Sequence, residues 1–133
     1  VQVYRSSFQP SPQCPEPYLM LAANVVAAES DEEAGLLATS LYQAFVNLRT
    51  GQPGKFPPPR QGYFESLDRK AQAMLSQVLS CSFIGGRETV ARKMQAFIDR
   101  HMPDELMLAG QLFDHGKRRQ SFEIAAECAS QLS

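Results

Sequence analysis

Two segments of this chain are continuous apolar runs without a charged residue. Each is followed by a segment in which apolar residues recur at regular intervals among polar ones. Residues 18–28 read YLMLAANVVAA and residues 106–110 read LMLAG. A short apolar run bounded by charged residues and Gly predicts a strand that is buried on both faces, as in parallel sheets. After each run, apolar residues recur at spacings of three and four, which predicts amphipathic helices.

The helix that follows the first apolar run has the clearest boundaries. Ser30 followed by Glu33 forms a capping box, and the acidic residues of the first turn suit the positive end of the helix dipole. Arg49 stands in the expected last turn, and Gly51 comes just after it. The sequence therefore predicts a helix from about residue 31 to about residue 49.

The remaining segments complete one strand and helix series, which we treat as a single domain or fragment over residues 1–133. Four of the nine prolines fall within the first 17 residues, after what resembles the end of a helix, and three more are consecutive in a later loop. That triple proline also resembles a ligand of proline-binding domains, although a structural loop is the simpler interpretation. The predicted segments are a connector (1–17), a strand and helix (18–50), a Pro/Gly loop (51–65), two helices around a short extended piece (66–103), and a strand and helix (104–133).

This order predicts an α/β fold. Strands that alternate with helices pair in parallel through right-handed crossovers. Apolar strands need cover on both faces and neighbours on both edges, and two strands with one short extended piece leave edges open. We therefore expect a partial (β/α)8 barrel of the TIM type, consisting of its last β/α units, whose edges are covered by missing residues or by another copy of the chain.

Composition and charge narrow the possible partners. The chain has 133 residues, with 44% hydrophobic and 20% charged residues, which is ordinary for one globular domain. The net charge of −1 gives no basic field for nucleic acid or an acidic membrane, and no apolar run reaches the ~20 residues of a membrane span. The first residue is Val1 rather than Met, which we interpret as a cut.

The three cysteines carry no metal or redox motif. Their spacings are wide and unrelated, and the sequence has no CxxC pattern and no Cys/His cluster. We therefore predict no metal site. A reduced, cytoplasmic setting is the better match, although spacing alone leaves disulfides open.

Candidate chemistry lies where predicted strands end, because ligands of α/β proteins bind at the carboxyl ends of strands. Asp114 and His115 follow the second apolar run, and His suits proton transfer near neutral pH. The alternative is that Asp114 caps the last helix and His115 lies in a loop. Gly85 and Gly86 precede a helix and resemble a phosphate-binding turn, while simple turn geometry also explains them. Arg118 has the chemistry to hold an anion, or to pair with Glu123.

A series of segments resembles one family along essentially the whole chain. The segments are YRSSFQPS, PYLMLAANVVAAESDEEA, LRTGQPGKFPPP, FIGGRETV and DELMLAGQLFDHGKRRQSFEIAA. Their order and spacing are similar to the carboxyl-terminal part of the bacterial luciferase-like, flavin-dependent monooxygenases. The positions that match the family pattern are Gly85, Glu88, Val90, Asp104, Glu105, Arg118 and Ser121.

The resemblance implies an oxidoreductase on a (β/α)8 barrel that binds reduced FMN and uses O2 on a small organic substrate. It makes Asp114 and His115 candidates for managing protons, and Arg118, Gly85 and Gly86 candidates for holding the flavin. Most flavin and substrate contacts in the family lie in the amino-terminal half, so we expect the 133-residue chain alone to be inactive. The alternative is a non-catalytic module that forms a homo-oligomer to cover its strand edges.

Overall fold

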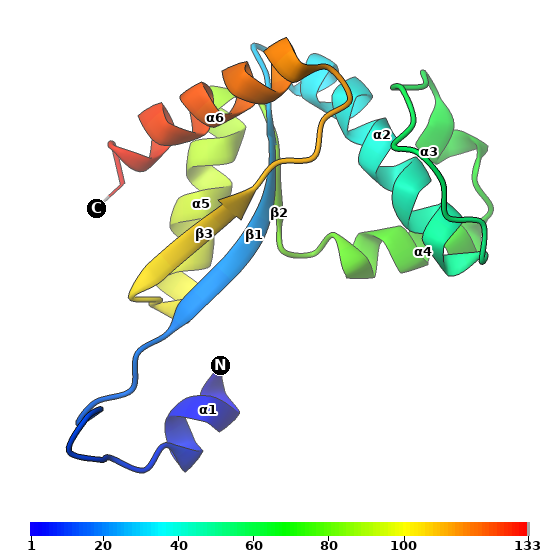
Figure 1. Ribbon diagram of the computed structural model, residues 1–133. Helices are drawn as coiled ribbons and strands as arrows, with labels where there is room; N and C mark the ends of the chain where they lie inside the picture. Colours follow the sequence, from blue (N-terminus) through cyan, green and yellow to red (C-terminus); the bar gives the residue numbers. More distant parts are fainter. Residues whose placement is uncertain (133) are drawn as a thin grey trace.

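The computed structural model describes residues 1–132 and contains three strands among six helices (Figure 1). Each strand after the first is preceded by a helix, so the chain has the predicted α/β character. The elements are α1 (Gln2–Ser7), β1 (Met20–Ala27), α2 (Asp31–Arg49), α3 (Tyr63–Ser66), α4 (Arg69–Val78), β2 (Ser82–Gly85), α5 (Arg87–His101), β3 (Glu105–Ala109) and α6 (His115–Ala129).

The sheet is parallel, with strand order β2-β1-β3. The first half of β1, Met20–Asn24, pairs with β3, and its second half, Asn24–Ala27, pairs with β2 on the opposite edge. Strands that follow one another in a barrel are neighbours. The pairing of β1 with β2 has that relation, whereas β3 lies on the other edge of β1 and not beside β2. The three parallel strands are thus consistent with part of a barrel.

One face of the sheet is covered along its length by α5 and α6. Alternate side chains of β1 point to this face, because successive residues of a strand point to opposite sides. They pack with Phe83 of β2 and with Leu106 and Leu108 of β3. In Figure 1, α5 lies behind the strands and α6 crosses above it. The buried residues of this cluster are Ala23, Val25, Ala27, Phe83, Val90, Met94, Ile124, Ala125 and Cys128.

The opposite face is covered only at its carboxyl half. There Val26 and Ala28 pack against α2 in a second cluster. At the amino half, Met20 is 50% exposed and Met107 of β3 is 54% exposed. In Figure 1, β3 and the first half of β1 lie in front, with no helix drawn over them. The prediction that both apolar runs form strands is right, but burial on both faces is wrong for β3, whose residues alternate between exposed and partly buried.

The helix boundaries follow local capping chemistry. Half of the predicted capping box is present: the Ser30 hydroxyl accepts a hydrogen bond from the Glu33 N–H at 3.1 Å, but the Glu33 carboxylate accepts from the Glu29 N–H at 3.3 Å rather than from Ser30. The last helix begins at His115 because Asp114 caps it, which is the alternative that the sequence left open for Asp114. The predicted loop between α2 and α4 contains the short helix α3, and α1 stands apart from the sheet (Figure 1).

Candidate functional site

The carboxyl ends of all three strands meet at one edge of the sheet, which is the edge where the sequence placed its candidate residues. Ala28 to Ser30 lead from β1 into α2, Gly86 leads from β2 into α5, and residues 110–114 lead from β3 into α6. Three helix N-termini therefore gather here, as expected for parallel strands joined by helices. We call this the carboxyl edge.

Asp31 joins α2 to the start of α5. Its carboxylate accepts a hydrogen bond from the Gly86 N–H at 2.6 Å and another from the Thr89 hydroxyl at 3.0 Å. Hydrogen bonding to Gly86 is the main reason that the pKa of Asp31 lies below its ordinary value of 3.8. A side chain from the first turn of one helix thus caps the N-terminus of the next.

Gly85 is required by this close approach. Its φ of +154° is rare for residues with a side chain, and a Cβ there would lie 2.5 Å from the Thr89 methyl carbon. A Cβ would also lie 2.7 Å from the Asp31 carboxylate. The glycine pair therefore serves a tight turn in which the Gly86 amide already has a partner. A phosphate bound at Gly85 and Gly86 would compete with Asp31 for that amide.

Asp114 and His115 lie at the start of α6, together with Arg118. The Asp114 carboxylate accepts a hydrogen bond from the Lys117 N–H at 2.8 Å and so acts as the helix cap. Arg118 Nη2 lies 2.9 Å from His115 Nδ1. Because a guanidinium only donates, Nδ1 must be the acceptor, and the imidazole proton belongs on Nε2. The structure thus brings His115 and Arg118 together within one helical turn.

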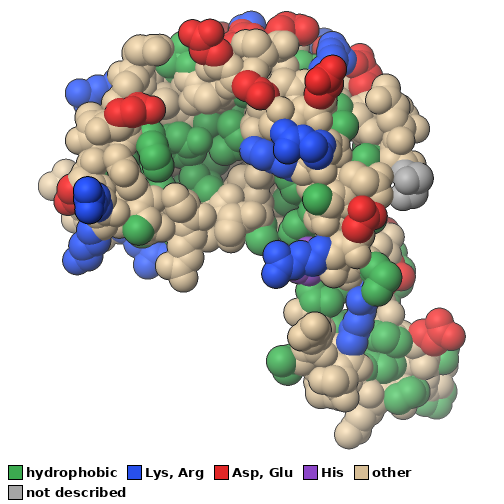
Figure 2. Space-filling view, turned by 180° about the vertical axis from the view of Figure 1, so that it is seen from behind, with side chains coloured by type: hydrophobic (Ala, Val, Ile, Leu, Met, Phe, Trp, Pro, Cys, Tyr) green, Lys and Arg blue, Asp and Glu red, His purple; other side chains and the backbone are tan. Residues whose placement is uncertain are grey.

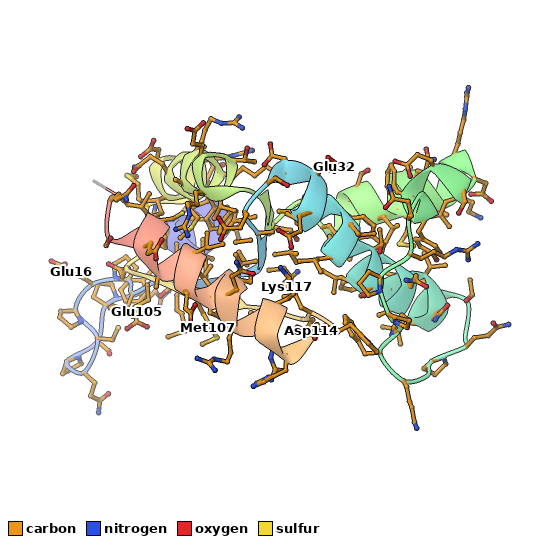
Figure 3. The ribbon with its side chains drawn as sticks, turned by 90° about the horizontal axis from the view of Figure 1, so that it is seen from above. Glu16, Glu32, Glu105, Met107, Asp114 and Lys117 are labelled. Carbon is orange, nitrogen blue, oxygen red and sulfur yellow. The ribbon has the colours of Figure 1, made fainter. Side chains whose placement is uncertain are left out.

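Lys117 links the start of α6 to α2. Its Nζ lies 2.5 Å from Glu33 Oε1, and Figure 3, which looks down on the carboxyl edge, shows Lys117 between the two helices and Asp114 at the beginning of α6. The hydrogen bond with Lys117 lowers the pKa of Glu33 below 4.5, and the same bond raises the pKa of Lys117 above 10.5. The pair fixes the relative position of two of the three helix N-termini.

Glu29 forms further polar contacts at the carboxyl edge, with Gln120 and Arg87. Its carboxylate accepts a hydrogen bond from the Gln120 amide at 2.9 Å and lies 3.8 Å from the Arg87 guanidinium. Arg87 also forms an ion pair with Glu127 of α6. These contacts join the segment after β1 to both α5 and α6.

A cleft of about 370 Å³ opens beside these groups, between the starts of α2 and α5. Three carboxylates line it, and the only cation among its lining residues is Arg87, so an anion is disfavoured there.

Within residues 1–132, no three His, Cys, Asp or Glu side chains are grouped as a metal ion would require. In the same residues, no helix has the length and apolar character needed to cross a membrane.

Some residues of the carboxyl edge were predicted from the sequence as site candidates, and others were not. Asp114, His115, Arg118, Gly85 and Gly86 all lie on it, and Asp104 instead accepts a hydrogen bond from the Leu19 N–H at the opposite end of β1, at 2.7 Å. Glu33 was recognised only as part of a capping box. Its pairing with Lys117, 84 residues away, follows from strand order and has no local signal.

Comparison with known proteins places nearly the whole chain in one group of relatives. A protein of Escherichia coli K12 named "Luciferase-like monooxygenase" is 39% identical over 132 residues, which cover 99% of this chain. The "Uncharacterized protein YvbT" of Bacillus subtilis is 37% identical over 127 residues, 96% of this chain. No family model matches the chain.

A solved structure has a similar fold. The crystal structure of apo-MsnO8 superposes on 97% of this chain with a TM-score of 0.74, at 20% sequence identity. The chain spans about two fifths of the length of the relatives, namely 39% and 38% of the two bacterial proteins and 40% of the MsnO8 chain.

Proposed function

We propose that this chain, which belongs to the luciferase-like monooxygenase family, provides part of a monooxygenase that uses reduced FMN and O2 on a small organic substrate. The observation that carries the proposal is the 39% identity to the Escherichia coli protein over 99% of the chain. Since the chain spans about two fifths of that relative, we assign turnover to a larger assembly and expect none from the 133 residues alone.

Within this proposal, the start of α6 suits a flavin phosphate better than the start of α5. Arg118 uses Nη2 for His115, and its remaining N–H groups are donors suited to an oxyanion. The Gly86 amide is instead bonded to the Asp31 carboxylate, whose charge repels phosphate. We therefore propose Arg118 as the main anion ligand of this chain, with Gly85 and Gly86 as ligands only if Asp31 moves away.

His115 and Asp114 would then have different tasks. Bound flavin would supply the redox chemistry with O2, and the protein would have to hold or move protons beside it. With Nδ1 accepting from Arg118, His115 carries its ring proton on Nε2, which is then the donor of the imidazole. The Asp114 carboxylate is engaged as the cap of α6, so we propose that it positions His115 and does not itself transfer a proton.

Flavin binding by the chain tests this proposal. We expect FMN fluorescence to be quenched on titration with the chain, with a dissociation constant on the order of 10⁻⁴ M or weaker because most contacts are absent. Arg118→Ala should weaken binding at least about threefold. Arg119→Ala removes the same charge one residue later, where the side chain pairs with Glu123 at 3.7 Å, and should have little effect. Equal losses in both variants, or no saturable quenching, would contradict an Arg118 site.

A second candidate function rests on the uncovered half of the sheet. Met20 and Met107 are each about half exposed, beside exposed Ala22 and Ala109, so the chain presents an apolar strip that water does not favour. A non-catalytic module that forms a homo-oligomer would bury it. Light scattering should then give a mass of at least twice 14.8 kDa, and Met107→Lys should return the monomer. A monomer at high concentration would exclude this alternative and leave the flavin proposal untouched.

The proposed compartment is the cytoplasm. The three cysteines are all free, which suits a reducing environment.

A further inference from the structure

A cavity of about 440 Å³ lies on the outer side of α2, between this helix and the segment that contains α3. The hydrophobic part of its wall includes the rings of Tyr42 and Phe64, which pack edge to face with their centroids 5.9 Å apart. Only Asp31 is shared with the carboxyl edge, so the cavity is a separate feature of the molecule. Figure 2 shows the back of the molecule, where hydrophobic side chains are visible at the surface, and the lining of the cavity itself is given by the residues named above.

The charge of the cavity is negative. Asp31, Glu32 and Glu65 line it, and none of its lining residues is Lys or Arg. Burial raises the pKa of Tyr42, and the negative charge of Glu65 raises it further, which places that carboxylate close enough to act on the ring. Among residues 1–132, the structure gives the carboxylates of Glu32 and Glu65 no hydrogen bond and no ion pair. Figure 3 shows Glu32 on the side of α2 that faces away from Lys117.

Gly35 keeps this space free. It lies within α2, where glycine is the least favourable residue apart from proline. A positive φ is not the reason, and neither is a close backbone approach, because a Cβ at Gly35 would meet nothing within 4 Å. The residue faces the cavity, so any side chain here would project into the space between α2 and α3.

We propose that this cavity binds a small organic cation, such as a quaternary ammonium group or a protonated amine with an apolar body. Aromatic walls attract such cations through the ring faces, and unpaired carboxylates at the same site add charge attraction without first having to lose a partner. An anion would meet three carboxylates and no cation. A neutral ligand would gain no charge attraction from Glu32 and Glu65, so charge is the property that the site selects.

Choline and its uncharged analogue 3,3-dimethylbutan-1-ol provide the test, because they share a shape and differ in charge. We would follow backbone amide shifts of the 133-residue chain by NMR at constant ionic strength. Choline should give saturable shifts around Gly35 and Tyr42 with a dissociation constant on the order of millimolar, and the alcohol should bind about tenfold more weakly. Equal affinity for both compounds, or no saturable choline shift up to ~50 mM, would overturn the proposal.

Two variants and one matched control complete the test. Glu65→Gln should raise the choline dissociation constant about threefold or more, whereas Glu16→Gln makes the same charge change in the amino-terminal connector and should leave it unchanged. Gly35→Leu should abolish binding by filling the cavity, while unfolding curves show that the fold is kept. Unchanged affinity in Gly35→Leu, or equal effects of the two Gln variants, would also overturn the proposal. None of these results depends on flavin binding.

Discussion

The two faces of β1 carry similar residues, but other elements cover the two faces to different extents. On one face, Val25 and Ala27 are buried by α5 and α6. On the other, Val26 and Ala28 are buried by α2, while Met20 and Ala22 remain open to solvent. The strand is therefore enclosed on both sides only near its carboxyl end.

The contrast follows from connectivity. The helices α5 and α6 lie along the whole of one face, whereas α2 starts at the carboxyl end of β1 and leaves the sheet at an angle (Figure 1). Hydrophobic side chains lower the free energy of folding only where another element removes them from water. We therefore expect substitutions on the two faces to differ sharply in their effect on stability.

The largest expected difference is between Phe83 and Met107. Phe83 is 3% exposed and packs edge to face on Phe97, so Phe83→Ala should lower the free energy of unfolding by about 3–5 kcal/mol through the cavity that it leaves. Met107→Ala removes a half-exposed side chain from the open face and should change the free energy of unfolding by less than about 0.5 kcal/mol. Urea unfolding of both variants at low protein concentration measures the comparison.

A large loss of unfolding free energy in Met107→Ala would contradict the expected difference between the covered and the open face. It would mean that the open face is covered in solution, and the loss should then depend on protein concentration, because association stabilises by mass action.

A smaller effect is expected at Ser121, which completes the covered face. Its buried hydroxyl accepts a hydrogen bond from the Ala27 N–H at 2.8 Å, beyond the point where β3 stops pairing with β1. Ser121→Ala should cost about 1–3 kcal/mol in unfolding free energy, because it leaves a buried amide without a partner. Ser130→Ala is the matched control at the C-cap of the same helix, where the hydroxyl is exposed and donates a hydrogen bond to the Glu127 carbonyl. If both variants lose a similarly small amount of unfolding free energy, a water molecule takes over the hydrogen bond from the Ala27 N–H when the Ser121 hydroxyl is removed.

Much of the architecture could be predicted from local patterns. The apolar runs became β1 and β3, and the Ser30–Glu33 capping box fixed the start of α2 within one residue. Local chemistry suffices there because a cap and its partner lie three residues apart.

The failures have a common physical origin in contacts between distant segments. Leu106 and Met107 are equally apolar, so nothing in the sequence indicates that only Leu106 finds a covering helix. The order β2-β1-β3 places Asp31 against Gly86 and Glu33 against Lys117, and neither pairing has a motif. The candidate residues Asp114 and His115 lie at the carboxyl edge, where Asp114 caps α6 and His115 is the first residue of that helix.

The smallest expected effect is the pH dependence of the contacts that hold α2 over its half of the sheet. The folded pKa values of Asp31 and Glu33 lie below their ordinary values of 3.8 and 4.5, so both contacts stabilise the fold above those values. Their contribution is lost as pH falls through the lowered values. The pKa of Lys117 is raised above 10.5, so its share of the ion pair is complete below that pH and is lost only as pH rises beyond it.

Glu33→Gln tests this tie between α2 and α6. The variant should lose part of the fall in urea midpoint that the unaltered chain shows between pH ~6 and ~3, because a neutral side chain binds no proton there. Glu32→Gln is the matched control, since Glu32 is the exposed neighbour on the same turn and has no contact with Lys117. If both variants keep the full pH dependence, the Glu33–Lys117 pair contributes nothing to closing α2 over the sheet. In that case the Asp31 hydrogen bonds and the hydrophobic contacts of Val26 and Ala28 hold α2 over the covered half without help from α6.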